Sequence, residues 1–161
     1  MTLQLYRIDD RLLHGQVVVG WGQPLEIKFI VLVDDTVAAS EWEQELYRMG
    51  VPPEMDVYFH SAEDAVTALA GYRADRRPGI LLTGDIATMA RLVDRAAVTH
   101  VNIGGIHSRP DRVQRMRYVF LSPDEEQQLR ALEARGVTIT AQDVPGARPI
   151  PLDDMLGGVE P

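Results

Sequence analysis

A short segment near the N-terminus brings together the side chains that phosphoryl transfer requires. Arg7 and Arg11 precede His14 by seven and three residues, and Gly15 follows the histidine. A neutral imidazole is a good nucleophile near neutral pH, and a guanidinium group holds phosphate oxygens in a planar fork. A helical turn in this segment would place Arg11 on the same side as His14. We therefore predict that His14 carries a phosphoryl group and that Arg11 stabilises its charge.

The other charged residues of the segment can play more than one role. Arg7 could contact the phosphate directly, or it could pair with Asp9 or Asp10 at the end of a strand. Either aspartate could orient the imidazole by accepting a ring N–H. A carboxylate close to the phosphoryl group would repel it, so bracing of Arg11 is the favoured role, with Asp10 the preferred residue. Residues 9–16 are called the histidine loop below.

The order of apolar runs along the chain predicts the fold class. Short β-branched runs alternate with longer amphipathic runs, which is typical of repeated βα units and a mostly parallel sheet. We predict an α/β fold with a single open, doubly wound, mostly parallel sheet of about seven strands and helices on both faces. The predicted strands cover residues 3–8, 27–33, 57–59, 80–83, 101–103, 118–121 and 137–140, and the predicted helices cover residues 16–22, 38–49, 62–72, 86–95 and 123–135.

Capping residues mark the starts of several predicted helices. Ser61 and Ser122 precede acidic first turns, and Asp85 could cap the fourth helix. Prolines and glycines are frequent in residues 145–161. This C-terminal tail is therefore predicted to follow an irregular path, with one short turn at residues 152–156, and then to fray.

The predicted topology places several loops around the histidine. Ligands of open α/β sheets bind beyond the carboxyl ends of strands, where neighbouring connections leave to opposite faces. If the first and fourth strands are neighbours, Thr83 and Gly84 lie against the histidine loop, and residues 104–107 form an adjacent wall. Glycines there let backbone amides approach an anion. Gly15 and Gln16 begin a helix, so their amides could also face the phosphate.

Composition argues against several classes of protein. With 161 residues, the chain is expected to form one domain over residues 1–161, and its 45% hydrophobic and 25% charged residues are typical of a soluble globular protein. The net charge of −8 argues against nucleic acid as a partner, because such binding relies on Lys and Arg. No signal peptide is expected, and no apolar run approaches the roughly 20 residues of a membrane span. The absence of cysteine excludes disulfides and is compatible with the cytoplasm.

Metal and dinucleotide sites are not predicted. His60, His100 and His107 have no metal-ligand spacing. His107 could line the pocket, although a surface position in its loop is favoured. Asp34 and Asp35 end a strand where dinucleotide folds place a ribose-binding acid, but the first strand–helix turn lacks the Gly-x-Gly-x-x-Gly pattern. No cofactor is therefore expected.

A basic stretch follows the paired glycines in an otherwise acidic chain. Its arginines are Arg109, Arg112, Arg115 and Arg117. One interpretation is a solvated loop and strand end. The other is an electrostatic docking patch for an acidic partner protein, which would speed encounter more than it tightens binding.

The segment RIDDRLLHGQV at residues 7–17 closely resembles the active-site segment of a known family. That family comprises the IIB subunits of the mannose/fructose/sorbose branch of the bacterial phosphoenolpyruvate-dependent sugar phosphotransferase system. Further segments resemble it in the same order, namely DDTVA at residues 34–38, VNIGGIH at residues 101–107 and the apolar pattern of residues 119–145. Two features differ, since Ile106 stands where the family often has Met and residues 108–112 lack its usual lysine- and glycine-containing turn.

This resemblance implies a phosphocarrier. His14 would accept a phosphoryl group from a phosphorylated IIA domain, through Nδ1 by analogy with the family, and pass it to a hexose held by the membrane subunits IIC and IID. The chain would thus be a protein-phosphohistidine–sugar phosphotransferase component, cytoplasmic and peripheral to the inner membrane through its transporter partners. A homodimer is expected from the resemblance alone.

Two other functions compete with sugar transport. The same histidine chemistry could report the phosphorylation state of the phosphotransferase system to a regulatory target, and genes for IIC and IID beside this one would argue against that role. An unrelated nucleotide-binding or hydrolytic α/β enzyme would instead show saturable turnover of a small phosphate ester by the isolated chain. The nature of the sugar does not follow from the sequence.

Overall fold

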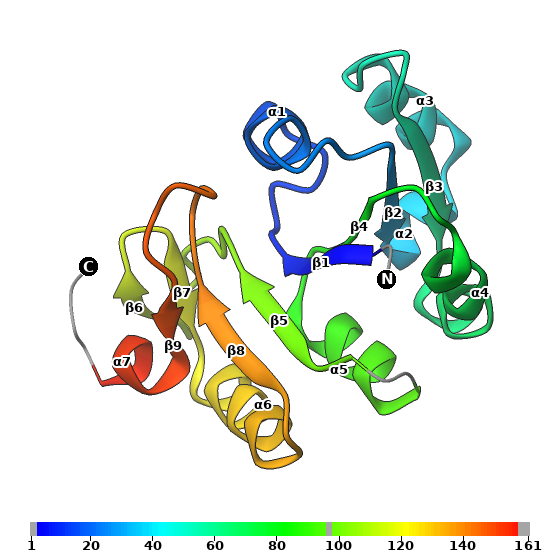
Figure 1. Cartoon of the computed structure of the whole chain (residues 1–161). Helices are drawn as coiled ribbons and strands as arrows, with labels where there is room; N and C mark the ends of the chain where they lie inside the picture. Colours follow the sequence, from blue (N-terminus) through cyan, green and yellow to red (C-terminus); the bar gives the residue numbers. More distant parts are fainter. Residues whose placement is uncertain (1–2, 96–97, 158–161) are drawn as a thin grey trace.

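A seven-stranded sheet forms the centre of the computed structural model, which describes residues 3–95 and 98–157 (Figure 1). The strands are β1 (Leu3–Ile8), β2 (Phe29–Val33), β3 (Asp56–His60), β4 (Gly79–Thr83), β5 (His100–Ile103), β8 (Thr138–Ala141) and β9 (Ile150–Pro151). Their order is β3-β2-β4-β1-β5-β8-β9, and neighbouring strands are parallel except β8 and β9. The predicted α/β class with a mostly parallel sheet is confirmed.

Helices cover both faces of this sheet. The helices are α1 (Gly15–Gly22), α2 (Asp35–Ala38), α3 (Glu41–Met49), α4 (Ala62–Ala74), α5 (Ile86–Arg95), α6 (Pro123–Ala134) and α7 (Leu152–Leu156). The first three pack on one face and the last four on the other, which divides the apolar side chains into two cores. Among the described residues, no helix combines the length and the apolar character that crossing a membrane requires.

The central strands β2 and β4 are apolar because both of their faces are covered. Every residue of both strands is buried. In β2, Ile30 and Leu32 belong to one core, and Val31 and Val33 belong to the other. Strands with helices on both sides are expected to read as continuous hydrophobic runs. Full burial of each such side chain contributes about 1.5–3 kcal/mol to stability.

Strand β1 lies between β4 and β5, and this position defines the edge where the candidate site lies. Ile8 at the end of β1 is aligned with Thr83 of β4 and with Ile103 of β5. The chain leaves β1 for α1 on one face of the sheet, and it leaves β4 for α5 on the opposite face. The first and fourth strands are thus neighbours, which is the condition stated for the predicted site, and their carboxyl ends form a topological switch point.

The predicted capping residues are present at their helices. The Ser61 hydroxyl accepts the N–H of Asp64 at 3.1 Å. Ser122 and Glu125 form a complete capping box, in which each side chain accepts the backbone N–H of the other residue at 3.1 and 2.9 Å. The Asp85 carboxylate accepts an N–H in the first turn of α5 at 2.7 Å. Local polar signals in the sequence thus determine where these helices begin.

The helix predicted over residues 38–49 is present as α3 over residues 41–49, but its predicted start is wrong, because α2 ends at Ala38 and a separate helix begins after Ser40. Ser40 lies between them, and its hydroxyl accepts the N–H of Glu43 at 3.2 Å. The Asp34 carboxylate caps α2 by accepting the N–H of Val37 at 2.9 Å. Side chains that bond nearby backbone groups compete with a continuous helix, and Ser40 begins a new one.

The strand predicted over residues 118–121 does not join the main sheet. It forms β7 (Val119–Leu121), which pairs antiparallel with β6 (Val113–Met116) in a separate two-stranded sheet. The seventh position is taken by β9, which pairs with β8 within the tail that was predicted to be irregular. The short turn predicted at residues 152–156 is present as α7. The predicted fraying concerns residues 158–161, which lie outside the described part of the chain.

Replacing Gly79 by alanine should destabilise the fold. An added Cβ would overlap the ring of Phe29, which is fully buried on the neighbouring strand. We expect Gly79→Ala to lower the free energy of unfolding by about 1–3 kcal/mol, because overpacking displaces buried side chains. Gly71→Ala is the matched control, since its Cβ would meet nothing within 4 Å in α4 and should stabilise by about 0.5–1 kcal/mol. Equal midpoints of urea unfolding for the two variants would contradict this account.

Candidate functional site

The histidine loop is attached to both strands that flank β1. The N–H of Asp9 donates to the carbonyl of Thr83 at 2.9 Å, and the N–H of Asp10 donates to the carbonyl of Gly105 at 2.8 Å. The loop then turns sharply, because the N–H of Leu12 donates back to the carbonyl of Asp9 at 3.0 Å and Leu12 has a φ of 54°. The start of the loop therefore has a fixed position relative to the sheet.

His14 is an exposed residue at the beginning of α1. Its carbonyl accepts the N–H groups of Val17 and Val18 at 2.9 and 3.0 Å, so the helix starts directly at the histidine. Figure 1 shows the chain leaving the carboxyl end of β1 and continuing into α1. The N-terminus of a helix favours negative charge, because its first backbone N–H groups and its dipole point toward an anion. The imidazole is thus accessible to another protein at a position that suits a phosphoryl group.

A buried carboxylate holds the two arginines of this segment. Asp9 and Arg7 are fully buried, and their side chains pair at 3.0 Å. Arg11 donates to Asp9 from Nε at 2.8 Å, from Nη2 at 2.6 Å and from its backbone N–H at 3.1 Å. The side chain of Arg11 is 17% exposed. Asp9 therefore fixes the guanidinium of Arg11 at the surface, three residues before His14.

Arg7 connects the Asp9–Arg11 ion pair to β5 and to the β8–β9 loop. Its Nη1 donates to the side chain of Asn102 and to the carbonyl of Gln142, and its Nη2 donates to the carbonyl of Asp143 at 3.2 Å. The guanidinium carbon lies 4.4 Å from the centre of the Trp21 ring. Trp21 also donates from Nε1 to the carbonyl of Asp143 at 3.1 Å. Arg7 is thus a structural cation that joins β1, β5, α1 and the β8–β9 loop.

The charges of this cluster reinforce one another. Burial raises the pKa of Asp9, but the hydrogen bonds from Arg11 and the charge of Arg7 outweigh burial, so the pKa is lowered. Hydrogen bonding to Asp9 raises the pKa of Arg11. Burial lowers the pKa of Arg7, and the charge of Asp9 opposes this effect. The cluster therefore holds one anion and two cations at neutral pH, and Arg11 presents the cation closest to solvent.

The paired glycines after β5 make room for these side chains. A Cβ at Gly104 would overlap Arg7 Nη2 and Asp9 Oδ2, and a Cβ at Gly105 would lie 3.0 Å from Arg11 Nε. The predicted wall formed by residues 104–107 is present beside the histidine loop. The glycines accept the packed guanidinium and carboxylate groups, a role that the sequence analysis did not assign to them.

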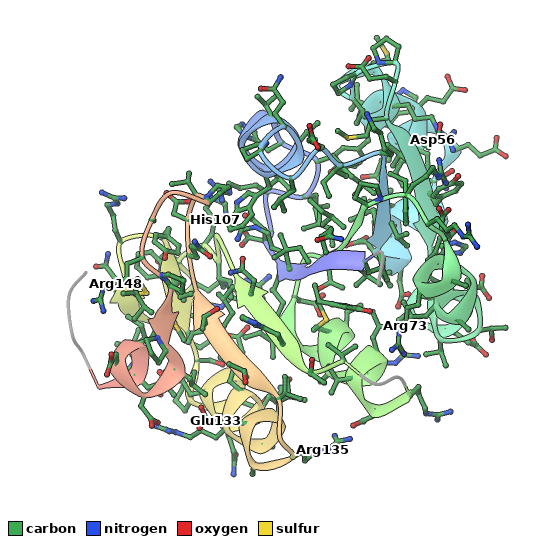
Figure 2. The ribbon with its side chains drawn as sticks, viewed as in Figure 1. Asp56, Arg73, His107, Glu133, Arg135 and Arg148 are labelled. Atoms are coloured by element: carbon green, nitrogen blue, oxygen red, sulfur yellow. The ribbon has the colours of Figure 1, made fainter. Side chains whose placement is uncertain are left out.

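The preference for Asp10 as the brace of Arg11 is wrong, because Asp9 has that role. Asp10 instead accepts the backbone N–H of His107 at 2.8 Å and pairs with its Nδ1 at 2.6 Å. His107 is exposed and lies in the loop beyond β5 (Figure 2). The physical reason is the geometry at the end of β1. Arg7 and Asp9 share one side of the strand, whereas Asp10 follows the turn toward the β5 loop.

The other predicted supporting residues hold the loop in place. Thr83 is buried, and its hydroxyl donates to the carbonyl of Asp85 at 3.2 Å. Gly84 packs closely against Leu12, since a Cβ at Gly84 would be 3.0 Å from the leucine side chain. Gln16 belongs to α1, and its side chain lies outside the described part of the structure. The phosphate-binding roles predicted for these residues remain predictions.

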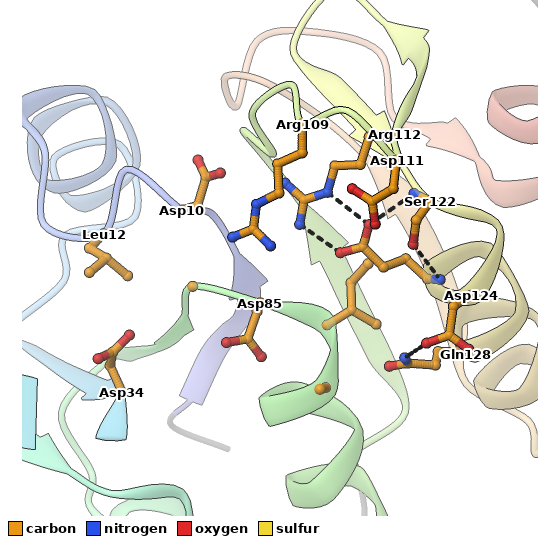
Figure 3. A pocket seen from close by; sticks show the side chains of 14 residues that line it. Asp10, Leu12, Asp34, Asp85, Arg109, Asp111, Arg112, Ser122, Asp124 and Gln128 are labelled. Carbon is orange, nitrogen blue, oxygen red and sulfur yellow. Dashed lines mark hydrogen bonds and ion pairs between the residues drawn. The ribbon is translucent and has the colours of Figure 1, made fainter. Parts of the chain in front are cut away.

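A cavity of about 510 Å³ lies beside the histidine loop (Figure 3). Asp10 and Leu12 contribute to its wall from the loop, and Asp34 and Asp85 contribute from the ends of β2 and β4. Arg109 reaches into it from the β5–β6 connection (Figure 3). Carboxylates dominate this wall, so the cavity is less suited to an anion than the surface formed by Arg11 and the start of α1.

Two arginines of the basic stretch form ion pairs with glutamates of α6. Arg112 forms a fork with Glu125 at 2.8 and 2.7 Å, and Arg115 forms one with Glu126 at 2.6 and 3.1 Å. Arg109 and Arg117 are the exposed members. These ion pairs favour a structural role for half of the stretch. Any electrostatic docking by this stretch would rest mainly on Arg109 and Arg117.

The remaining histidines have structural contacts. His60 Nε2 lies 2.6 Å from the hydroxyl of Tyr72, and His100 Nε2 lies 2.9 Å from the hydroxyl of Thr140. Burial lowers the pKa of both imidazoles. Within residues 3–95 and 98–157, no group of three histidine or acidic side chains is arranged to hold a metal ion.

Sequence reasoning missed three contributors to the site, which are Trp21, Asn102 and Asp143. Trp21 is buried in α1, and it also donates to the β8–β9 loop. Asn102 is a buried polar residue within a strand, and such a residue needs a partner. That signal was available in the sequence. The sequence around Asp143 gives no such signal, because its contacts depend on where the β8–β9 loop lies relative to β1.

Known proteins share both the sequence pattern and the fold. The family model described as PTS system sorbose subfamily IIB component matches residues 3–160. The PTS system sorbose-specific EIIB component of Klebsiella pneumoniae is 34% identical over 142 residues, covering 86% of this chain and 85% of that protein. The PTS system mannose-specific EIIAB component of Escherichia coli (strain K12) is 27% identical over 164 residues, covering 99% of this chain and 50% of that protein. The crystal structure of the IIBSor domain of the sorbose permease from Klebsiella pneumoniae has a TM-score of 0.89 at 29% identity, covering 99% of this chain and 98% of that one.

The fold and the site thus define a phosphotransferase component of a bacterial sugar-transport system. The chain belongs to the mannose/fructose/sorbose family of IIB components, within the sorbose subfamily. The family membership inferred from residues 7–17 is confirmed.

Neutralising Asp9 should strongly destabilise the protein. In Asp9→Asn, the two arginines would lose their shared buried anion, and breaking such a buried pair typically costs about 3–5 kcal/mol. Because the pKa of Asp9 is lowered in the folded state, its contribution is complete above the usual carboxyl pKa of about 4 and is lost as pH falls through the lowered pKa. Urea unfolding of the wild type and the variant at pH 7 and at pH 3 measures both effects.

Asp10→Asn is the matched control for this prediction. Asp10 is partly exposed and pairs with an exposed histidine, so its loss should cost less than about 1 kcal/mol. A difference between wild type and Asp9→Asn that stays constant down to pH 3 would argue against an ionised, buried Asp9.

Proposed function

We propose that this chain is a phosphocarrier whose His14 accepts a phosphoryl group from a phosphorylated IIA component and passes it to a sugar. The observation that carries the proposal is the exposed His14 at the start of α1, three residues after an arginine that a buried carboxylate fixes in place. This arrangement combines an accessible nucleophile with a positioned cation. Membership in the IIB family supports the same function.

The transfer needs little chemistry beyond positioning and charge neutralisation. A ring nitrogen of His14, Nδ1 by analogy with the family, attacks the phosphorus of the donor phosphohistidine. A new N–P bond forms while the donor N–P bond breaks, so the phosphoryl group exchanges one imidazole for another. In the second step the sugar hydroxyl attacks phosphorus, the N–P bond to His14 breaks, and the hydroxyl proton is released. Such transfers depend on in-line approach and on stabilisation of the phosphoryl oxygens.

Arg11 and α1 supply that stabilisation. The raised pKa of Arg11, which results from its hydrogen bonds to Asp9, keeps the guanidinium charged. The backbone amides at Gly15 and Gln16 lie at the start of α1, where the helix dipole favours the phosphate. Because Asp9 holds Arg11 before the donor arrives, little rearrangement is needed when the phosphoryl group binds.

The exposed position of His14 suits transfer between two different proteins. We propose IIA as donor and the membrane subunits IIC and IID as the holders of the sugar. The mannose-specific EIIAB component of Escherichia coli aligns with this chain over only half of its own length, which supports association with a IIA unit. We further propose that residues 1–161 form one IIB domain that works in the cytoplasm at the inner membrane through these partners. The expected homodimer remains a prediction.

Replacing His14 should abolish phosphorylation. Incubation of the purified chain with phosphorylated IIA should give acid-labile, base-stable label on the wild type and none on His14→Ala. His107→Ala is the matched control, because it removes another exposed histidine next to the same loop and should retain the label. Label that persists on His14→Ala would refute the assignment.

Replacing Arg11 should slow transfer without removing the acceptor. Loss of one positioned hydrogen-bond donor typically lowers the rate of the chemical step by about 10²–10³-fold. Arg11→Ala should therefore be labelled slowly. Arg11→Lys should also be impaired, because a single ammonium cannot form the fork with Asp9. A time course of labelling with quenched samples measures the transfer rates, and circular dichroism checks that both variants are folded. Wild-type rates in both variants would leave Arg11 a purely structural residue.

A further inference from the structure

Asp143 lies in the loop between β8 and β9, and its backbone and side chain have separate partners. The carbonyl accepts hydrogen bonds from Arg7 at 3.2 Å and from Trp21 at 3.1 Å. The carboxylate is 25% exposed and faces Arg11 at 3.5 Å and Arg117 at 4.0 Å. The carbonyl therefore belongs to the fixed scaffold of the site, whereas the carboxylate belongs to its surface.

The contact between Asp143 and Arg11 uses the edge of the guanidinium that faces away from Asp9. Asp9 occupies the edge formed by Nε and Nη2, with distances of 2.8 and 2.6 Å. Nη2 carries a second N–H, which points to the opposite edge, and the Oδ1 atom of Asp143 lies 3.5 Å from Nη2. The edge formed by Nε and Nη2 is taken by Asp9, so a phosphate that accepts the second N–H of Nη2 displaces Asp143 from it. This N–H of Nη2 is the donor for which Asp143 and a phosphoryl group would compete.

The two carboxylates on Arg11 differ in how easily they can be exchanged. Asp9 is fully buried and makes short contacts, whereas Asp143 is partly exposed and makes one long contact. Exposed ion pairs contribute little to stability, so the Asp143 contact can be replaced at small cost. Arg117, which is 84% exposed, lies on the other side of the carboxylate at 4.0 Å and offers it a second cation.

We propose that Asp143 is a positioning residue for phosphoryl transfer. In the unphosphorylated chain it holds the outer edge of Arg11, and when the phosphoryl group forms on His14 the carboxylate yields this edge and pairs with Arg117. This inference rests on the proposed function of His14. Because the displaced carboxylate stays close to the phosphate, like-charge repulsion weakens the phosphorylated state and favours onward transfer.

Asp143→Asn tests this role, because it removes the charge and keeps the backbone carbonyl. Phosphoramidate serves as donor, since attack by His14 on its phosphorus forms the N–P bond and releases ammonia. A titration followed by ³¹P NMR then gives the pKa of the phosphohistidine. Removal of a nearby negative charge favours the dianion, so we expect that pKa to fall by about 0.5 unit in Asp143→Asn. A purely structural role of Asp143 would not move it.

The equilibrium with phosphorylated IIA provides the second measurement. We expect Asp143→Asn to raise the equilibrium constant for phosphorylation of the chain about threefold to tenfold, and Asp143→Glu to restore most of the wild-type value. Asp153→Asn is the matched control. Asp153 lies on α7, and its exposed carboxylate pairs with Arg130 of α6 at 2.6 Å. This variant should change neither measurement.

The outcomes separate this inference from the proposed function. If wild type carries label on His14 but Asp143→Asn shows an unchanged ³¹P pKa and an unchanged equilibrium, the role of Asp143 is overturned and the phosphocarrier function stands. If wild type takes no label on His14, both are overturned. A higher pKa or a lower equilibrium constant in Asp143→Asn would also overturn the role, because both have the opposite sign.

Discussion

The ion pairs of the buried Asp9 carboxylate with two arginines are the interaction on which the site depends. A carboxylate without contact to water is strongly unfavourable unless cations and hydrogen bonds compensate it. Here Arg7 compensates it from inside the domain, and Arg11 compensates it from the surface. Because Arg7 also binds the β8–β9 loop and stacks on Trp21, the same charges join β1, β5 and α1 at one edge of the sheet.

This arrangement separates the rigid and the accessible parts of the site. The cation is fixed by Asp9, whereas the histidine that would carry the phosphoryl group is exposed at the start of α1. A phosphocarrier that serves two partners needs both properties, since a partner must reach the imidazole and the charge must already be in place when it does. Asp143 adds a weaker, exchangeable contact on the outer edge of Arg11. The structure thus combines one permanent and one replaceable carboxylate on a single guanidinium.

Much of the fold follows from local signals in the chain. The apolar runs of β2 and β4 and the capping residues Ser61 and Ser122 predict strands and helix starts, because burial on both faces and cap hydrogen bonds are local requirements. The strands β6 and β9 were not predicted. Each is short, and it exists only because a partner strand lies beside it. Pairing between distant segments leaves little trace in the periodicity of either one.

For the site, residues 7–17 alone indicate the family and predict phosphoryl chemistry with His14 as the reacting residue, because they place one nucleophile and two cations close together in the chain. The three-dimensional structure determines which aspartate holds Arg11, since Asp9 and Asp10 are adjacent and chemically identical, and the direction of the chain after β1 buries Asp9 and leaves Asp10 partly exposed. It also decided the roles of Gly104 and Asp143. Both depend on how closely segments from distant parts of the chain approach the same guanidinium groups, and packing alone sets those distances.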